Sequence, residues 1–287
     1  MTDLANRALL VGLTINSWPA RKLDKRESIE VAARNGAAEG TARVNKSLLP
    51  MADSLEFIQR VSGAAKTYYY ANTLPWVEGL RIIKSDAYIG FARAMGDHKI
   101  KFDNAVQEFA RQYPQLRADA ALLLGSLYSD NDYPDPSSVS QRFAMDVAFY
   151  PVPSASDWRV DLADSQMEKL RQQITETITA SQARAMRETW QRLYDVVEKA
   201  HTKLSQPDAL FRDSLIENIR EMCEVLPTFN IADDPQLEAM RRAIEGSICR
   251  YEPQGLRKND VARTRATDQL RDIMAKMGGM YDMRAAA

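Results

Sequence analysis

The side chains that most often carry chemistry in proteins are sparse in this sequence. Its 287 residues include two histidines, His98 and His201, and two cysteines, Cys223 and Cys249. Neither histidine has a second histidine or a cysteine at the spacing of a metal site. His98 lies in a predicted exposed turn, and His201 lies near the end of a predicted helix, where the helix dipole favours a cation. We therefore expect no metal site and no nucleophile paired with a base.

Other polar motifs also point away from catalysis. Both cysteines fall inside apolar helical patterns, which predicts buried thiols in a reducing compartment. The acidic run Asp130, Asp132 and Asp135 has the composition of a calcium loop, but Pro134 occupies a ligand position and the closing glutamate is missing. Turn and cap formation explains this run better. The sequence contains no phosphate-binding glycine loop and no pair of E-x-x-H motifs for a di-metal site, so we expect no cofactor and no enzymatic activity.

Two clusters combine aromatic with basic side chains, a composition that can bind single-stranded nucleic acid. The first places Trp18 directly before a basic stretch, and the second joins Tyr69 and Trp76 to nearby lysine and arginine residues. A solvated helix start and ordinary core packing are the competing interpretations. The candidate interaction residues are Trp18, Arg21, Lys22, Lys25, Arg26, Tyr69 and Trp76.

The composition is typical of a soluble globular protein with one large or two ordinary domains. Hydrophobic residues make up 45% of the chain and charged residues 27%, with a formal net charge of −1. This near-neutral balance gives no overall attraction to nucleic acid or anionic membranes, although residues 20–46 carry seven basic against four acidic side chains. No apolar run is long enough to span a membrane, and the first residues lack signal-peptide features. We expect a cytoplasmic protein without membrane contact.

The longest predicted element is a helix over residues 164–205, which contain neither glycine nor proline. Apolar residues recur there at intervals of three, four, seven or eight, with charged residues between them, as in an amphipathic helix. At about 1.5 Å per residue the helix would span roughly 60 Å, so its stripe needs partner helices from this chain or from another copy. The candidate packing and oligomer residues are Met167, Leu170, Ile174, Ile178, Met186, Leu193 and Val197.

The remaining patterns predict further helices and few strands. Residues 8–18 predict a strand, and two shorter extended pieces are expected near 146–150 and 158–160. Pro75 and Gly79 interrupt the pattern and predict a loop over 71–81. The helices are expected over 24–35, 52–70, 85–95, 102–113, 114–128, 207–226, 233–247 and 260–277.

The predicted fold class is mainly α. A helical N-terminal lobe with a small β element is followed by a long-helix, coiled-coil-like C-terminal helical hairpin and bundle. The expected parts are a mainly helical lobe over 1–128, a proline-rich junction with short extended pieces over 129–163, and a long-helix bundle over 164–287. A break in the long helix near 179–185, where the apolar spacing is weakest, would remove most support for its role in association.

A series of proline, glycine and aromatic motifs runs through residues 8–165. In order, these motifs are Trp18-Pro19-Ala20-Arg21-Lys22-Leu23, Thr73-Leu74-Pro75-Trp76 with Gly79, Phe109, Tyr113-Pro114, Asp132-Tyr133-Pro134, Phe143, Tyr150-Pro151-Val152-Pro153 and Asp157. With these motifs the sequence resembles a family of phage and prophage proteins known as domain of unknown function 3150. The motifs are structural in type, and the family defines no catalytic residue. The resemblance implies a bacterial host cell and gene neighbours that encode ring-forming ATPases, von Willebrand A-type proteins or phage recombination proteins.

These observations favour a non-enzymatic phage-type assembly protein that self-associates into a homo-oligomer or acts as an adaptor. The resemblance implies a ring ATPase or another phage protein as the partner. The alternative is a nucleic-acid-binding accessory protein in phage replication or recombination, based on the two basic and aromatic clusters. An enzyme with a site assembled from scattered residues is the third hypothesis.

Overall fold

The computed structural model describes residues 4–154, 164–206 and 210–285. Over these residues the protein is mainly helical with a small antiparallel sheet, which confirms the predicted class in its coarse form. Contacts divide the chain into two compact units. The first unit comprises residues 1–12, 72–91 and 149–287, and the second comprises 13–71 and 92–148. Each unit combines segments that are not consecutive in the sequence. The parts predicted from the sequence, 1–128, 129–163 and 164–287, are consecutive segments, and this division stays a prediction.

The strands form two sheets. The larger has the strand order β4-β5-β1-β6, with antiparallel pairing of β1 with β5 and of β4 with β5. Its strands are β1 (Ala8–Asn16), β4 (Leu74–Val77), β5 (Leu80–Lys84) and β6 (Ala144–Pro151). In the smaller sheet β2 (Arg21–Asp24) pairs antiparallel with β3 (Val44–Ser47). β1 and β6 confirm the strands predicted near 8–18 and 146–150, whereas the piece predicted near 158–160 lies outside the described residues.

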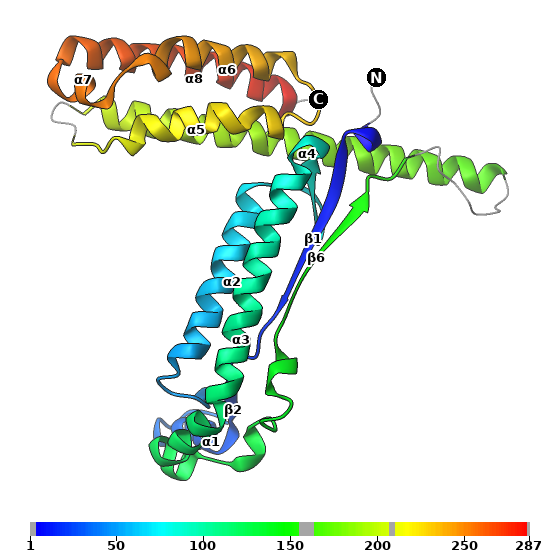
Figure 1. Ribbon diagram of the computed structural model, residues 1–287, viewed down its shortest axis with the longest axis vertical. Helices are drawn as coiled ribbons and strands as arrows, with labels where there is room; N and C mark the ends of the chain where they lie inside the picture. Colours follow the sequence, from blue (N-terminus) through cyan, green and yellow to red (C-terminus); the bar gives the residue numbers. More distant parts are fainter. Residues whose placement is uncertain (1–3, 155–163, 207–209, 286–287) are drawn as a thin grey trace. The chain divides into compact units, whose positions relative to one another are not determined.

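The described residues hold eight α-helices (Figure 1). They are α1 (Lys25–Arg34), α2 (Asp53–Ala71), α3 (Tyr88–Leu124), α4 (Asp164–Leu204), α5 (Ser214–Phe229), α6 (Pro235–Ser247), α7 (Pro253–Lys258) and α8 (Asp260–Ala285). Short 3-10 turns are η1 (Leu4–Asn6), η2 (Ser85–Ala87), η3 (Gly125–Leu127), η4 (Asp130–Asp132), η5 (Val139–Arg142) and η6 (Ile248–Arg250). At the starts of α1 and α6, the Asp24 carboxylate accepts from the N–H of Glu27 and the Asp234 carboxylate from that of Gln236, so each aspartate is the N-cap of its helix.

The loop predicted over residues 71–81 is wrong. The segment forms the β4–β5 hairpin, with Val77 opposite Leu80. Pro75 is tolerated because β4 is an edge strand of its sheet and can lack one ladder N–H. Gly79 supplies the positive φ of the turn, at 77°. From the sequence, Pro75 and Gly79 were interpreted as residues that interrupt helices and strands. In the structure, Pro75 lies within β4 and Gly79 forms part of the turn of the hairpin.

The three helices predicted between 85 and 128 are one helix of 37 residues, α3. Pro114 lies inside it rather than at the start of a new helix. Proline removes one backbone hydrogen bond there. The cost is offset by packing, because Phe109 and Tyr113 on the same turn are fully buried. His98 correspondingly lies on this helix and not in an exposed turn, and its ring contacts that of Tyr68 on α2.

Three boundaries in the C-terminal region also differ from expectation. α5 begins at Ser214 rather than near Pro207, which lies outside the described residues, and it continues through Pro227. The segment between the helices expected over 233–247 and 260–277 contains the short helix α7, with Pro253 at its first position. α8 continues beyond residues 278–279, because those glycines stay helical and do not adopt the positive φ of a helix stop.

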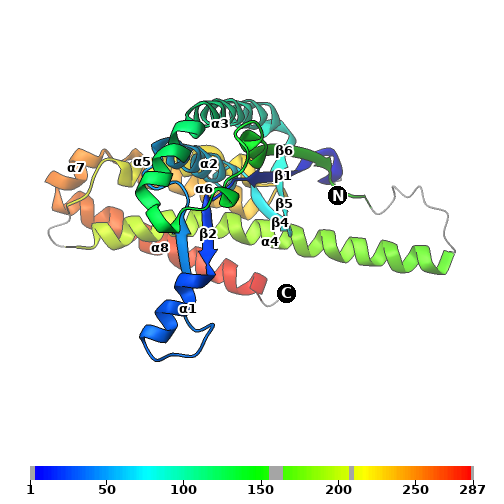
Figure 2. The same ribbon diagram turned by 90° about the horizontal axis from the view of Figure 1, so that it is seen from below.

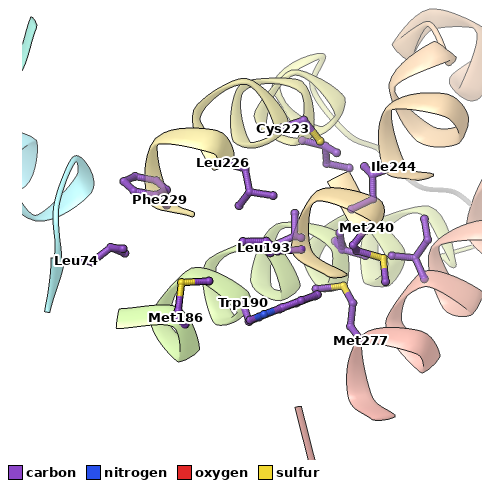
Figure 3. Close-up of a cluster of buried hydrophobic side chains, with 14 of the residues drawn as sticks. Leu74, Met186, Trp190, Leu193, Cys223, Leu226, Phe229, Met240, Ile244 and Met277 are labelled. Carbon is purple, nitrogen blue, oxygen red and sulfur yellow. The ribbon is translucent and has the colours of Figure 1, made fainter. Parts of the chain in front are cut away.

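The core of the first unit forms around the second half of α4. One face of this half is buried against α5 and α8, and β4 also packs on it. Figure 3 shows the α4 side chains facing those of α5, α6 and α8. The buried α4 residues are Ala185, Met186, Trp190, Leu193, Val197, Ala200 and Leu204. α4 is continuous through 179–185, so the break that would have removed most support for a role of this helix in association does not occur.

The core of the second unit combines α2 and α3 with residues from the connecting segments. α2 and α3 lie side by side (Figure 1 and Figure 2). Aromatic rings of α3 contact Phe143 and Trp18 edge to face, at centroid distances of 5.4 Å from Phe109 and 5.9 Å from Tyr113. The Tyr113 hydroxyl donates to the carbonyl of Pro134. Several motifs that carry the family resemblance therefore meet in this packed core.

Candidate interaction surfaces

The apolar stripe of α4 continues beyond the core that covers its second half. Among the described residues of the first unit, Met167, Leu170 and Ile174 do not join the buried cluster, and all three are partly exposed. Ile178 marks the transition, because it is partly buried and packs at the edge of the cluster. Figure 1 and Figure 2 both show the first half of α4 running beyond α5, α6 and α8. We call residues 166–178 the free α4 segment.

The structure divides the seven predicted packing residues into two groups. Met186, Leu193 and Val197 are at most 6% exposed and pack against helices of the same chain. Among the described residues of the unit, Met167, Leu170 and Ile174 neither belong to the buried cluster nor pack against it. The sequence pattern alone could not separate the groups, because the periodicity is the same along both halves of the helix.

The charges of the free α4 segment are balanced. It carries Glu168, Lys169, Arg171 and Glu176, two acidic and two basic side chains. Arg171 forms an ion pair with Glu168 on the same helix at 3.9 Å. The segment therefore has no net charge that would repel a second copy of itself.

Arginine side chains fix β4 onto the covered half of α4. Arg184 donates to the backbone oxygen of Trp76 at 3.0 Å, and Arg192 donates to that of Thr73 at 3.0 Å. The Arg192 guanidinium also lies over the Phe229 ring, at 4.9 Å from its centroid. Because Trp76 is 3% exposed and belongs to this core, its ring is packed away from solvent.

The first basic cluster does not form one surface. Lys22 on β2 pairs with Asp132 of η4 at 2.5 Å. Lys46 on β3, which was not singled out in the sequence, lies 2.8 Å from the other oxygen of Asp132 and 3.4 Å from Asp24. The Lys46 and Asp132 side chains are at most 10% exposed. Lys22 is itself half exposed, but it pairs with an ion network whose other side chains, Lys46, Asp24 and Asp132, are largely buried, and this network ties η4 to the smaller sheet.

The electrostatics of this network follow from its contacts. The pKa of Asp24 is lowered chiefly by the hydrogen bond from the Glu27 N–H, with a further contribution from Lys46. Burial acts to raise the pKa of Asp132, but hydrogen bonds from Lys22 and Lys46 outweigh it and the pKa is lowered. The pKa of Lys46 is raised, mainly by its hydrogen bond to Asp132. All three shifts favour the charged forms.

The remaining candidate cations stay at the surface. Arg21 and Lys25 are exposed and have no ion pair among the described residues, whereas Arg26 lies 3.3 Å from its neighbour Glu27. Of the candidate aromatic residues, Tyr69 is 4% exposed and Trp18 is partly buried against Tyr113. With Trp76 also buried, Tyr69 and Trp76 are closed to base stacking, and only part of the Trp18 ring is exposed.

The acidic run has partners within the second unit. Asp130 accepts from Arg117 and from the Tyr128 hydroxyl, Asp132 pairs with lysines, and Asp135 accepts from the N–H of Ser137. The described part of the chain holds no group of three or more histidine, cysteine or acidic side chains suited to a metal ion. None of its helices combines the length and apolar character needed to cross a membrane.

Comparisons of the chain with protein-family models, with curated proteins and with solved structures found no match. The resemblance to the phage family therefore stays a prediction.

Replacing Lys46 with methionine tests the ion network. The change removes the lysine that Asp24 and Asp132 share, while Asp132 keeps Lys22 and Asp24 keeps the Glu27 N–H, so we expect unfolding free energy to fall by about 1–3 kcal/mol at pH 7. A lowered carboxylate pKa stabilises the fold above about pH 4, and this contribution is lost as the pH falls further. The raised Lys46 pKa stabilises below about pH 10 and is lost above it. Urea titrations of wild type and variant should therefore differ most between these limits.

Lys25→Met is the matched control, because Lys25 is exposed and unpaired among the described residues. We expect it to change stability by less than about 0.5 kcal/mol. A Lys46→Met deficit as large at pH 3 as at pH 7 would contradict the assigned pKa shifts.

Proposed function

We propose that this protein is a non-enzymatic helical assembly protein that self-associates through the free α4 segment. The observation that carries the proposal is the half-covered stripe of α4. Its second half is buried by the chain's own helices, whereas Met167, Leu170 and Ile174 continue the same stripe without such cover. A partly exposed apolar stripe at helical spacing is the usual feature by which helices associate.

A second copy of the chain is the proposed occupant of this stripe. The segment is apolar along one face and carries two acidic and two basic side chains, so it is electrostatically compatible with itself. Pairing of identical segments about a two-fold axis gives a closed dimer in which each copy covers the other. Such an interface needs no complementary surface elsewhere on the molecule.

The size of the stripe limits the affinity. Burial of six apolar side chains, three from each copy, contributes on the order of 10 kcal/mol. Association itself costs roughly 4–15 kcal/mol in lost motional freedom. The two values are comparable and leave a net gain of at most about 6 kcal/mol, so the expected association is reversible, with a dissociation constant of about tens of micromolar at the tightest. Exchange of partners is then possible, and an adaptor role toward a ring ATPase or another phage protein remains part of the proposal.

Light scattering on the size-exclusion eluate tests the proposal with a charged pair on the stripe. Leu170→Glu combined with Ile174→Glu places carboxylates in the centre of the proposed interface. We expect wild type to show a mass above that of one chain at tens of micromolar, and the variant to dissociate at least about tenfold more readily. Circular dichroism should remain unchanged, because neither side chain belongs to the buried cluster.

Thr175→Glu with Thr179→Glu is the matched control. It introduces the same charges at the same spacing on an exposed face, since both threonines are exposed. A wild-type protein that stays one chain in mass up to 100 μM, or a control that dissociates as readily as the stripe variant, would overturn the proposal.

Nucleic-acid binding is the second candidate function. Arg21 and Lys25 support it, and Arg34 and Arg43 add two further exposed cations without an ion pair among the described residues. Phosphate contacts by such residues are sequence-independent and weaken steeply with salt. The Arg21→Glu, Lys25→Glu double variant should therefore abolish low-salt binding of labelled single-stranded DNA. No mobility shift of wild type at 20 mM salt would exclude this function.

A further inference from the structure

The second unit has a pocket between α1 and the loop that leads from α1 to β3. Its volume is about 200 Å³. Figure 2 shows α1 and this loop projecting away from α2 and α3, so the pocket lies on an accessible part of the unit. We call it the α1 pocket. The lining residues that decide its chemistry are Leu23, Lys25, Ile29, Glu39, Ala42 and Arg43.

The apolar part of the α1 pocket is aliphatic and incompletely covered. Leu23 of β2 and Ala42 of the loop are partly exposed, and Ile29 of α1 is 46% exposed. Sites for drug-sized molecules usually enclose about 300–1,000 Å³ and are lined largely by apolar side chains. The α1 pocket is smaller than this range and suits a single large apolar side chain. Anchor side chains at protein interfaces occupy pockets of this kind.

The charges that line the α1 pocket are not neutralised within the described structure. Lys25 and Arg43 are exposed and have no ion pair among the described residues. Glu39 is the one acidic side chain of the lining, so two cations and one carboxylate leave a net charge of +1. The nearby Lys22 and Lys46, by contrast, are paired with Asp132. The excess positive charge favours an acidic ligand.

Hydrogen bonds hold the walls of the α1 pocket in place. Ser28 is 9% exposed, and its hydroxyl accepts from the Val44 N–H at 3.0 Å, which joins α1 to β3. In the loop, Thr41 donates to the Ala38 carbonyl oxygen from its N–H at 3.2 Å and from its hydroxyl at 2.7 Å. Gly40 supplies the positive φ of this turn, at 89°. A wall that is already ordered lowers the entropic cost of binding.

We propose that the α1 pocket binds an acidic peptide segment of a partner protein. One leucine or phenylalanine side chain of the peptide packs against Leu23, Ile29 and Ala42, and carboxylates on either side of it approach Lys25 and Arg43. Nucleic acid fits the same pocket less well, because its lining holds no aromatic ring on which a base could stack and because a carboxylate is present. The pocket belongs to the second unit and the free α4 segment to the first, so this binding is independent of the proposed self-association.

Methyl NMR of the full-length protein tests the proposal. The probe is a synthetic peptide in which leucine is flanked by two glutamates on each side. We expect the Ile29 methyl signal, identified by its loss in Ile29→Val, to shift with a dissociation constant of roughly 0.1–1 mM, since one anchor gives weak binding. The same peptide with serine in place of leucine should bind at least about tenfold more weakly, because the pocket then buries no apolar side chain.

A matched pair of charge variants tests the cations of the α1 pocket. Lys25→Met with Arg43→Met should weaken binding of the leucine peptide at least about fivefold in 20 mM salt. Arg21→Met with Arg34→Met removes two exposed cations outside the lining and should change the affinity less than about twofold. The remaining isoleucine methyl signals check that each variant keeps its fold.

Four results would overturn the assignment of the α1 pocket. They are no shift of the Ile29 methyl signal up to about 5 mM leucine peptide, equal binding of the leucine and serine peptides, an equal loss of affinity in the two variant pairs, and an Ile29 shift at lower concentration with oligothymidylate than with the peptide. The last result would assign the pocket to nucleic acid instead.

Discussion

The apolar stripe of α4 is the constraint on which the first unit depends. A helix of 41 residues cannot bury its own stripe, so other elements must cover it. The chain supplies α5, α8 and the edge strand β4, and these cover the half that begins near Ala185. Leu193 and Val197 in this half have no exposed surface at all. The remaining half keeps the same pattern without such cover, and the proposed function follows from that difference.

Hydrogen bonds fix the positions of the elements that pack on the second half of α4. Arg184 donates to the backbone of Trp76 in β4, and Arg192 donates to that of Thr73, the residue before β4. The Trp190 indole donates to the Asp234 carboxylate, which also caps α6. A hydrophobic stripe alone permits neighbouring helices to slide along it. Buried or partly buried donors that lie on defined acceptors restrict that freedom, because a shift would break these hydrogen bonds. The covered half of α4 is thereby held in one register.

The second unit is organised by a different interaction, its largely buried ion network. Lys46 and Lys22 converge on Asp132, and Asp24 shares Lys46 while its own oxygen caps α1. Residues distant in sequence are thereby joined around a short 3-10 turn. Two of the motifs that support the family resemblance, at Trp18–Leu23 and Asp132–Pro134, meet through these contacts. Their role in this structure is to position backbone segments.

The helices whose position depends on interactions between residues close in the sequence were predicted correctly. The absence of glycine and proline with a regular apolar period was enough for α4, and the helices expected to begin near 24 and 233 begin at Lys25 and Pro235. Pro75, Pro114 and the glycines at 278–279 misled the prediction, because tertiary packing or edge position made each of them acceptable inside an element.

The candidate residues were harder to interpret, because their roles depend on contacts distant in sequence. Lys22 and Asp132 are 110 residues apart, and Arg192 and Thr73 are 119 apart. No periodicity signals such pairs. The sequence therefore located the basic and aromatic clusters but could not tell that Lys22 is paired and that Tyr69 and Trp76 are buried.

The central claim is that one half of the α4 stripe is covered within the chain and the other only by a second copy. Hydrogen exchange measured at several protein concentrations tests it most directly, because protection conferred by association depends on concentration. The account predicts that protection of residues 166–178 rises as the concentration increases from 1 to 100 μM, while that of 186–204 stays constant. Protection of 166–178 that is independent of concentration would contradict it.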